Sequence, residues 1–117
     1  MKVTAFGRQL RKLRIDHDMI MKDLADVLGV SSAYVSALEL GKKNITEKHI
    51  NKIIGYFSMN DREIMELRQN ADISQPSVKL ELNGASDAQR ELAVSFARRY
   101  QEMNPEEQKK IMKLLER

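Results

Sequence analysis

Apolar residues recur at three- and four-residue spacing over the first 70 residues of this 117-residue chain. Such spacing is typical of short amphipathic helices that turn one side toward a core. The pattern predicts helices at residues 4–16, 21–28 and 32–40, and two more that begin after Thr46 and after Asn60. These two residues and Ser31 are the predicted N-caps of their helices, and the basic residues of the first helix, Arg14 among them, are expected on its outer side. Five short helices around one core form a complete all-α domain, which we place at residues 1–70.

The second and third predicted helices are joined by a tight turn at Gly29. Such a turn requires a positive φ angle, which glycine adopts without steric cost. The small Ala25 lies where the two helices must nearly touch, while Val30, Val35 and Leu38 form the apolar underside. This is the layout of a helix-turn-helix, in which the second helix of the pair lies in the major groove of DNA.

The distribution of charge agrees with a DNA ligand. Residues 1–57 carry 10 basic and 6 acidic side chains, whereas residues 58–117 carry 10 and 11. The excess positive charge therefore lies in the half of the chain that holds the helix-turn-helix. A basic surface attracts phosphate through Coulomb interaction and through the release of counterions.

Four short segments carry a resemblance to a known family: Leu24-Ala25, Leu28-Gly29-Val30-Ser31, Val35-Ser36, and Glu39 followed by Gly41 and Lys42. Their small, glycine and apolar positions are in register, so residues 4–70 resemble the Xre family of bacterial and phage regulators, which includes the Cro and lambda-type repressors. The resemblance implies a five-helix lambda-repressor-like domain that binds double-stranded DNA. This family often has Gln at the first position of the second helix, where it contacts a phosphate. Met21 occupies that position here and cannot make the contact.

The resemblance also implies which residues meet DNA. The outward side of the third helix would read base edges through Ser32, Ala33, Ser36 and Ala37, with Tyr34 at the flank. These short side chains cannot form the bidentate pairs that discriminate strongly between bases, so we expect part of the readout to come from DNA shape or bridging water. Phosphate contacts are expected from Lys22, Ser31, Lys42, Lys43 and Asn44.

Several of these residues have a structural explanation beside the functional one. Tyr34 could pack over the domain surface, and residues 42–43 could belong to an ordinary solvated loop. Glu39 is expected to orient local structure by pairing with a nearby basic residue rather than to touch DNA. The isolated His17 and His49 are expected at the surface.

The pattern changes after residue 70. We expect a linker at residues 71–85, in which residues 78–82 alternate apolar and polar side chains as a short strand does. A lone strand is unstable, so its partner would be the same segment of a second copy. The alternative is an extended linker.

Two more helices are predicted at residues 86–117, the first ending near residue 103, and together they form a helical hairpin. Ser86 to Gln89 match a capping box, and Asn104-Pro105 match a helix start. A hairpin of this size buries too little surface to be stable alone, so it must pack on the first domain, on another copy or on a partner protein. The candidate dimer interface comprises Val78, Leu80, Leu82, Leu92, Phe96, Tyr100, Ile111 and Leu115.

Together these features predict a sequence-specific transcriptional regulator, specifically a homodimeric repressor that reads a two-fold symmetric operator. The alternative is an antitoxin that represses its own operon and binds a toxin, or another regulatory protein, through residues 71–117. No nucleophile–base pair, glycine-rich phosphate loop or metal-ligand spacing is present, and the chain has no Cys, so we expect no catalytic residue, metal or cofactor.

The sequence also predicts a cytoplasmic protein without a membrane partner. No apolar run approaches the roughly 18 residues that a membrane span needs. Basic residues interrupt the start of the chain, so no signal peptide is expected.

Overall fold

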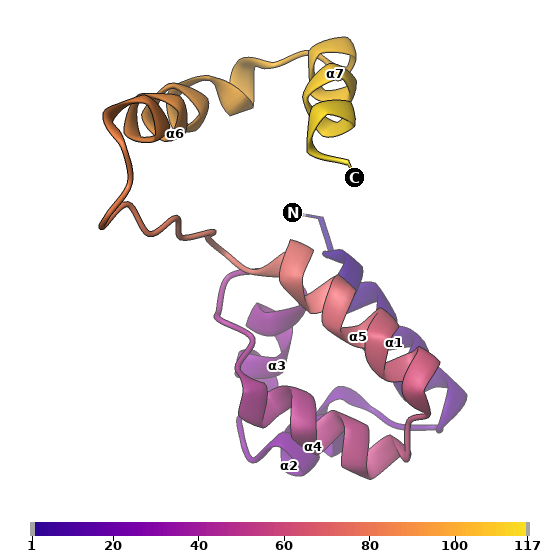
Figure 1. Ribbon diagram of the computed structural model, residues 1–117. Helices are drawn as coiled ribbons and strands as arrows, with labels where there is room; N and C mark the ends of the chain where they lie inside the picture. Colours follow the sequence, from indigo (N-terminus) through magenta and orange to yellow (C-terminus); the bar gives the residue numbers. More distant parts are fainter. Residues whose placement is uncertain (1, 117) are drawn as a thin grey trace. The chain divides into compact units, whose positions relative to one another are not determined.

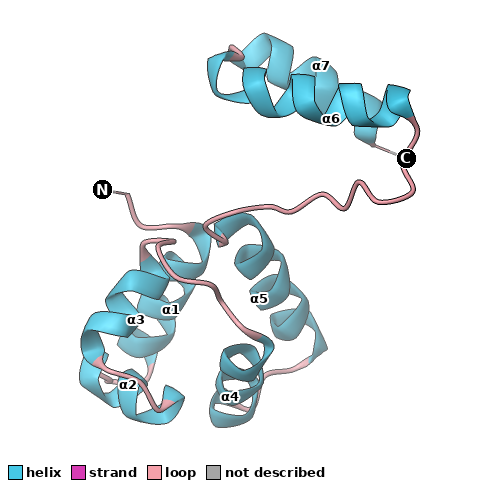
Figure 2. Ribbon diagram, turned by 90° about the vertical axis from the view of Figure 1, so that its left-hand side faces the viewer, coloured by secondary structure: helices cyan, strands magenta, loops and turns pink. Residues whose placement is uncertain are grey.

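A computed structural model describes residues 2–116, and within that range every regular element is helical (Figures 1 and 2). The described chain divides into two units, of which the first ends at Val78 and the second begins at Lys79. The helices are α1 (Ala5–Asp16), α2 (Met21–Leu28), α3 (Ser32–Glu39), α4 (Glu47–Phe57), α5 (Asp61–Ser74), α6 (Asp87–Arg99) and α7 (Pro105–Leu115), with a 3-10 turn η1 (Tyr100–Glu102) between the last two.

The first unit is built around one apolar core to which all five of its helices contribute. α1 packs along α5, and α2 packs against α3 and α4 (Figure 1). The fully buried apolar side chains are Phe6, Leu10, Leu24, Leu28, Val35, Leu38, Ile53 and Leu67. The predicted caps at Ser31, Thr46 and Asn60 are confirmed, since each side chain accepts a hydrogen bond from an amide in the first turn of its helix.

α5 is longer than its sequence pattern predicts. We expected a connector from residue 71, but the helix continues to Ser74 because its last turns are part of the core. Ala71 and Ser74 are buried, and the Ser74 hydroxyl accepts a hydrogen bond from the Phe6 amide at 3.0 Å. Backbone that is anchored in this way lies in the first unit rather than in a linker.

The strand predicted at residues 78–82 is wrong: within residues 2–116 no strand forms, as Figure 2 shows. A strand needs a neighbouring segment to complete its ladder of hydrogen bonds, and no described segment lies beside this one. The Leu82 carbonyl instead accepts hydrogen bonds from the Ala85 amide at 3.0 Å and from Arg90 at 2.7 Å, which closes a turn. Residues 78–82 therefore agree with the alternative, a linker.

The second unit holds α6, η1 and α7. The predicted capping box at the start of α6 is present, since Ser86 accepts from the Gln89 amide at 3.1 Å. The predicted helix start at Asn104 is also confirmed, and it forms a capping box as well, with Asn104 accepting from the Glu107 amide at 2.8 Å. α6 ends at Arg99, before the predicted end near residue 103, and the chain tightens there into η1. No residue of these elements is buried.

Among the described residues, no helix combines the length and apolar character that crossing a membrane requires.

Candidate nucleic-acid interface

The turn between α2 and α3 is formed as the sequence predicts. Gly29 ends α2 with φ 71° and ψ 32°, a left-handed conformation that a side chain would strain. The Val30 amide donates to the Ala25 carbonyl at 3.0 Å, which closes the turn. Lys52 of α4 donates to the Leu28 carbonyl at 3.1 Å, placing a positive charge at the negative end of α2. The angle between the two helices is thus held by backbone geometry and by a third helix.

α3 presents two distinct sides. Its inner side consists of Val35, Leu38 and Glu39, all of which are buried. The outer side carries the predicted base-contacting residues: Ala33 is exposed, and Ser32, Ser36 and Ala37 are partly exposed. The structure therefore brings these four short side chains together on one open surface of a single helix.

The flank and the start of α3 are partly occupied by contacts within the domain. Tyr34 is half-buried, and its ring lies 5.7 Å from the ring of His49, so part of this side chain packs over the domain surface. The Ser31 hydroxyl oxygen accepts from the Tyr34 amide at 3.0 Å. Its hydroxyl hydrogen remains able to donate to a phosphate.

Glu39 anchors the end of α3 to α1. Its carboxylate is fully buried and accepts from Arg14 at 3.0 and 3.2 Å and from Arg11 at 3.2 Å. Hydrogen bonds between two charged groups are roughly twice as strong as those between neutral groups. The expectation that Glu39 pairs with a basic residue to orient local structure agrees with this geometry.

The backbone at the end of α3 also lies directly against α1. The Glu39 carbonyl accepts from both the amide and the hydroxyl of Thr4, each at 3.0 Å. Gly7 makes this approach possible, because a Cβ at that position would overlap the Glu39 carbonyl. α3 is consequently held by a side-chain ion pair and by two backbone-directed hydrogen bonds.

The loop after α3 exposes Lys42, Lys43 and Asn44. Gly41 opens the loop with φ 73°, and its end is fastened by Gln75, just after α5. The Gln75 amide accepts from the Ile45 amide and donates to the Ile45 carbonyl, both at 2.8 Å. The two loop lysines thus project from a short segment that is fixed at both ends.

The start of α2 offers a further group of donors. Lys22 is exposed, whereas Met21 is partly buried against the core. The amides of Met21 and Lys22 precede the first backbone hydrogen bond of the helix and point outward, whereas the Asp23 amide donates to the Ile20 carbonyl at 3.1 Å. The Asp23 carboxylate already accepts from the Ile20 amide at 2.9 Å. Since Met21 turns inward, the positive charge at this point comes from Lys22 and the helix start.

The two histidines differ in their surroundings. His17 is exposed, as expected, and its ring meets Phe57 edge to face at 4.8 Å. The expectation for His49 is wrong: it is buried, because Tyr34 of α3 packs over its ring. The ring also accepts a hydrogen bond from the Thr46 amide at 3.2 Å within the α4 capping box. Burial, and then the charges of Lys52 and Lys48, lower the pKa of His49 below its ordinary value of 6.5.

Three residues that hold the interface were not identified from the sequence. Arg14 was expected on the outer side of its helix, yet its side chain is only 14% exposed because it pairs with Glu39. A signal existed, since Glu39 lies four residues after Val35 on the apolar side of its helix and a buried carboxylate requires cationic partners. Lys52 and Gln75 carry no comparable signal.

Comparison with known proteins agrees with the sequence and the geometry. Residues 10–60 match the family HTH_3, described as helix-turn-helix, a segment that contains α2, α3 and α4 completely. No curated protein and no solved structure matches the chain. Within residues 2–116 no group of three His, Asp or Glu residues could hold a metal ion. A domain of this family implies DNA binding and is characteristic of transcriptional regulators. Residues 10–60 are therefore a helix-turn-helix domain of the Cro/C1-type, Xre-like family, with further helices beyond it.

Proposed function

We propose that this protein is a homodimeric transcriptional repressor that places α3 in the major groove of a two-fold symmetric operator. The observation that carries the proposal is the open side of α3, held rigidly by Glu39 and bordered by exposed lysines. A helix fixed in this way can present base-reading side chains without first being ordered. A protein that occupies promoter DNA blocks transcription by covering it.

The composition of the α3 surface favours a close approach to the bases. Ser32 and Ser36 can donate to or accept from several base edges, while Ala33 and Ala37 can pack against a thymine methyl group. None of them supplies a long bidentate contact, so each base pair would be read modestly. Sequence-dependent DNA shape and bridging water would supply the remaining discrimination.

Phosphate contacts would set the register of α3 in the groove. Lys22 at the start of α2 and Lys42, Lys43 and Asn44 after α3 are exposed. Such contacts carry no sequence information but position the protein on the duplex. They also make the affinity strongly dependent on salt.

The dimer follows from the size of the reading surface. One helix contacts only about 4 to 6 base pairs, whereas a two-fold dimer places two reading helices about 34 Å apart on one side of the DNA. Doubling the site in this way raises the discrimination between an operator and random DNA.

The test is to measure, by fluorescence anisotropy across a salt series, how the full chain binds the DNA upstream of its own gene. We expect tight, sequence-dependent binding to a two-fold symmetric site that weakens steeply as salt rises. Ser32→Glu and Ala37→Glu should abolish it through repulsion from the DNA. Asn51→Glu, an exposed substitution on α4, adds the same charge away from α3 and is the matched control.

The control variant should lose at most the small affinity that one extra negative charge costs. If the two α3 variants bind the site as well as the wild type, then α3 does not read the groove. Binding of equal strength to every duplex would refute sequence-specific regulation from this promoter.

A further inference from the structure

The helices of the second unit have well-formed N-terminal caps, but these helices form no buried core. The helices α6 and α7 both begin with a complete capping box, yet neither has a buried residue. Large apolar side chains instead lie open on α6, η1 and α7: Leu92, Phe96, Tyr100, Met112 and Leu115 are between 43 and 71% exposed. Most helical stability in proteins comes from covering such an apolar side.

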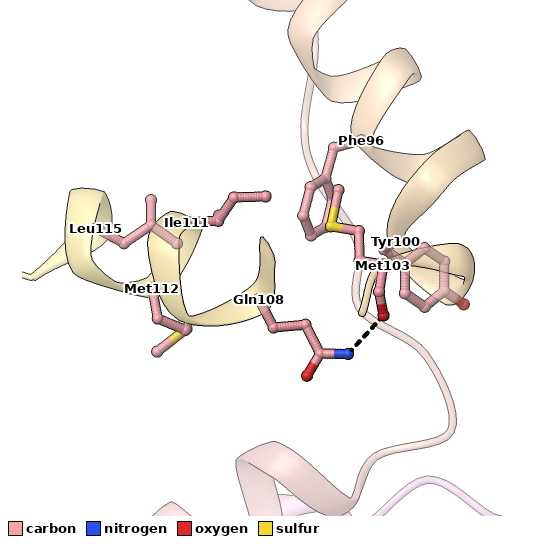
Figure 3. Close-up of a pocket in the computed structure, with 7 residues that line it drawn as sticks. All are labelled: Phe96, Tyr100, Met103, Gln108, Ile111, Met112 and Leu115. Carbon is pink, nitrogen blue, oxygen red and sulfur yellow. Dashed lines mark hydrogen bonds between the residues drawn. The ribbon is translucent and has the colours of Figure 1, made fainter. Parts of the chain in front are cut away.

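Four of these five side chains, all except Leu92, border one hollow of about 270 Å³. Leu92 lies one helical turn before Phe96 on the same side of α6 and extends the apolar surface beyond the hollow. Phe96 and Tyr100, stacked with ring centroids 6.0 Å apart, border it from the end of α6. Ile111 and Leu115 of α7 also line the hollow, and Figure 3 shows Ile111 pointing toward Phe96. Gln108 donates to the Met103 carbonyl at 3.0 Å and so ties the start of α7 to the connection that precedes it (Figure 3). The hollow is thus an apolar hole between two helices whose connection is fixed.

Neither a disulfide nor a bound metal ion stabilises the described part of this unit in place of an apolar core. The chain has no Cys, and the described residues hold no metal-binding cluster. Units of about 40 residues without disulfides or metals usually need association to be stable. The apolar surface must therefore be covered by protein.

The amount of apolar surface matches that of a dimer interface. If a large apolar side chain presents roughly 200 Å² when fully exposed, the exposed fractions of the five residues above leave about 600 Å². A standard interface covers about 800 Å² on each partner, of which about 65%, or about 500 Å², is apolar in homodimers. Covering this surface would therefore bury as much apolar area as a standard homodimer interface does.

The charges of this unit also suit a second copy. Residues 79–116 carry seven basic and seven acidic side chains, so two such units do not repel each other. α6 has Asp87 in its first turn and Arg98 and Arg99 in its last, and α7 likewise begins acidic and ends basic. A two-fold contact in which equivalent helices run antiparallel brings the acidic start of one beside the basic end of the other.

We infer that the hollow between α6 and α7 is the dimerisation surface and that its occupant is the same surface of a second copy. Each copy supplies apolar side chains to the hole of the other, and the two units together form one closed core. The inference rests on the proposed function, which requires a dimer, and it assigns the surface that makes it. The α3 helices of the two copies are then brought together by residues that lie outside the DNA-binding unit.

Sedimentation equilibrium of the full chain without DNA tests the inference. Phe96→Glu and Leu115→Glu each put a charge into the hollow and should raise the dimer dissociation constant at least about 100-fold, as loss of a central interface contact does. Val94→Glu and Leu114→Glu are matched controls, because they lie on the same helices, are exposed and do not line the hollow. The controls should change the constant by less than about threefold.

Two results would overturn the inference. A wild-type chain that sediments as a 13.5 kDa monomer at every concentration would mean that something else covers the hollow, such as a foreign protein. A dimer that survives both hollow variants would place the interface elsewhere. Neither result bears on base reading by α3, whereas an intact dimer without operator binding would refute the DNA-reading proposal alone.

Discussion

The substitution Glu39→Gln tests how α3 is held in place. It removes a buried negative charge and leaves Arg14, whose side chain is 14% exposed, without a counter-ion. Removing one partner of a buried pair costs about 3–5 kcal/mol, because the remaining charge stays desolvated. Gln keeps one oxygen that can accept from Arg14, and Arg11 is half-exposed and can turn to water. We therefore expect a loss of about 3 kcal/mol, the lower end of that range.

The assay is urea and thermal unfolding followed by far-ultraviolet circular dichroism. For a unit of this size, a loss of about 3 kcal/mol lowers Tm by roughly 12–24 °C. Glu47→Gln is the matched control, since the Glu47–Arg68 pair is exposed on both sides and should contribute nothing measurable. The double variant Glu39→Leu with Arg14→Leu should regain most of the stability, because no buried charge is left unpaired.

A loss below about 1 kcal/mol for Glu39→Gln would refute the reasoning, since the pair would then be worth no more than a surface contact. The reasoning would fail equally if the double variant were as unstable as the single one. That result would locate the loss in packing at the end of α3 rather than in an uncompensated charge.

Three further predictions follow from the same unit. The pKa of His49 is lowered in the folded state, so the fold favours its neutral form, and Tm should fall as pH drops below about 6.5. Melting curves recorded between about pH 8 and 5 check this. The fall in Tm should be shallower in His49→Gln, whose side chain still accepts a hydrogen bond at the helix cap. Gly7→Ala should cost more than about 2 kcal/mol in urea unfolding, because its Cβ collides with the Glu39 carbonyl, and a smaller loss would show that α1 and α3 can separate freely. Lys42→Ala and Lys43→Ala should each reduce the salt slope of DNA binding by about 1 without altering sequence preference, and unchanged slopes would remove these lysines from the phosphate contacts.

Local pattern was sufficient wherever an element is stabilised by its own neighbours along the chain. The caps at Ser31, Thr46 and Asn60 and the turn at Gly29 depend on residues within three or four positions, so the sequence predicts them correctly. The open side of α3 could be read in the same way, because the buried Val35 and its apolar neighbours fix the orientation of that helix.

Pattern failed where the decisive partner is distant in sequence. Residues 78–82 alternate like a strand, but a strand exists only beside another segment. Arg14 was placed outside because charged residues are usually exposed, yet its partner lies 25 positions away. His49 is likewise buried by α3, through Tyr34, and not by its own helix. The end of α5 was missed because the small residues Ala71 and Ser74 give little periodic signal.

The division of α3 into an inner and an outer side has an evolutionary consequence. Val35, Leu38 and Glu39 hold the helix, and none of them belongs to the open surface formed by Ser32 and Ala37 with their neighbours. Substitutions on the open surface can therefore accumulate without unfolding the protein, and under the base-reading role that we propose for α3 each would alter which DNA is preferred. A lineage can acquire a new target by a few such changes while inheriting its architecture intact, so closely related copies within one genome can diverge into separate circuits.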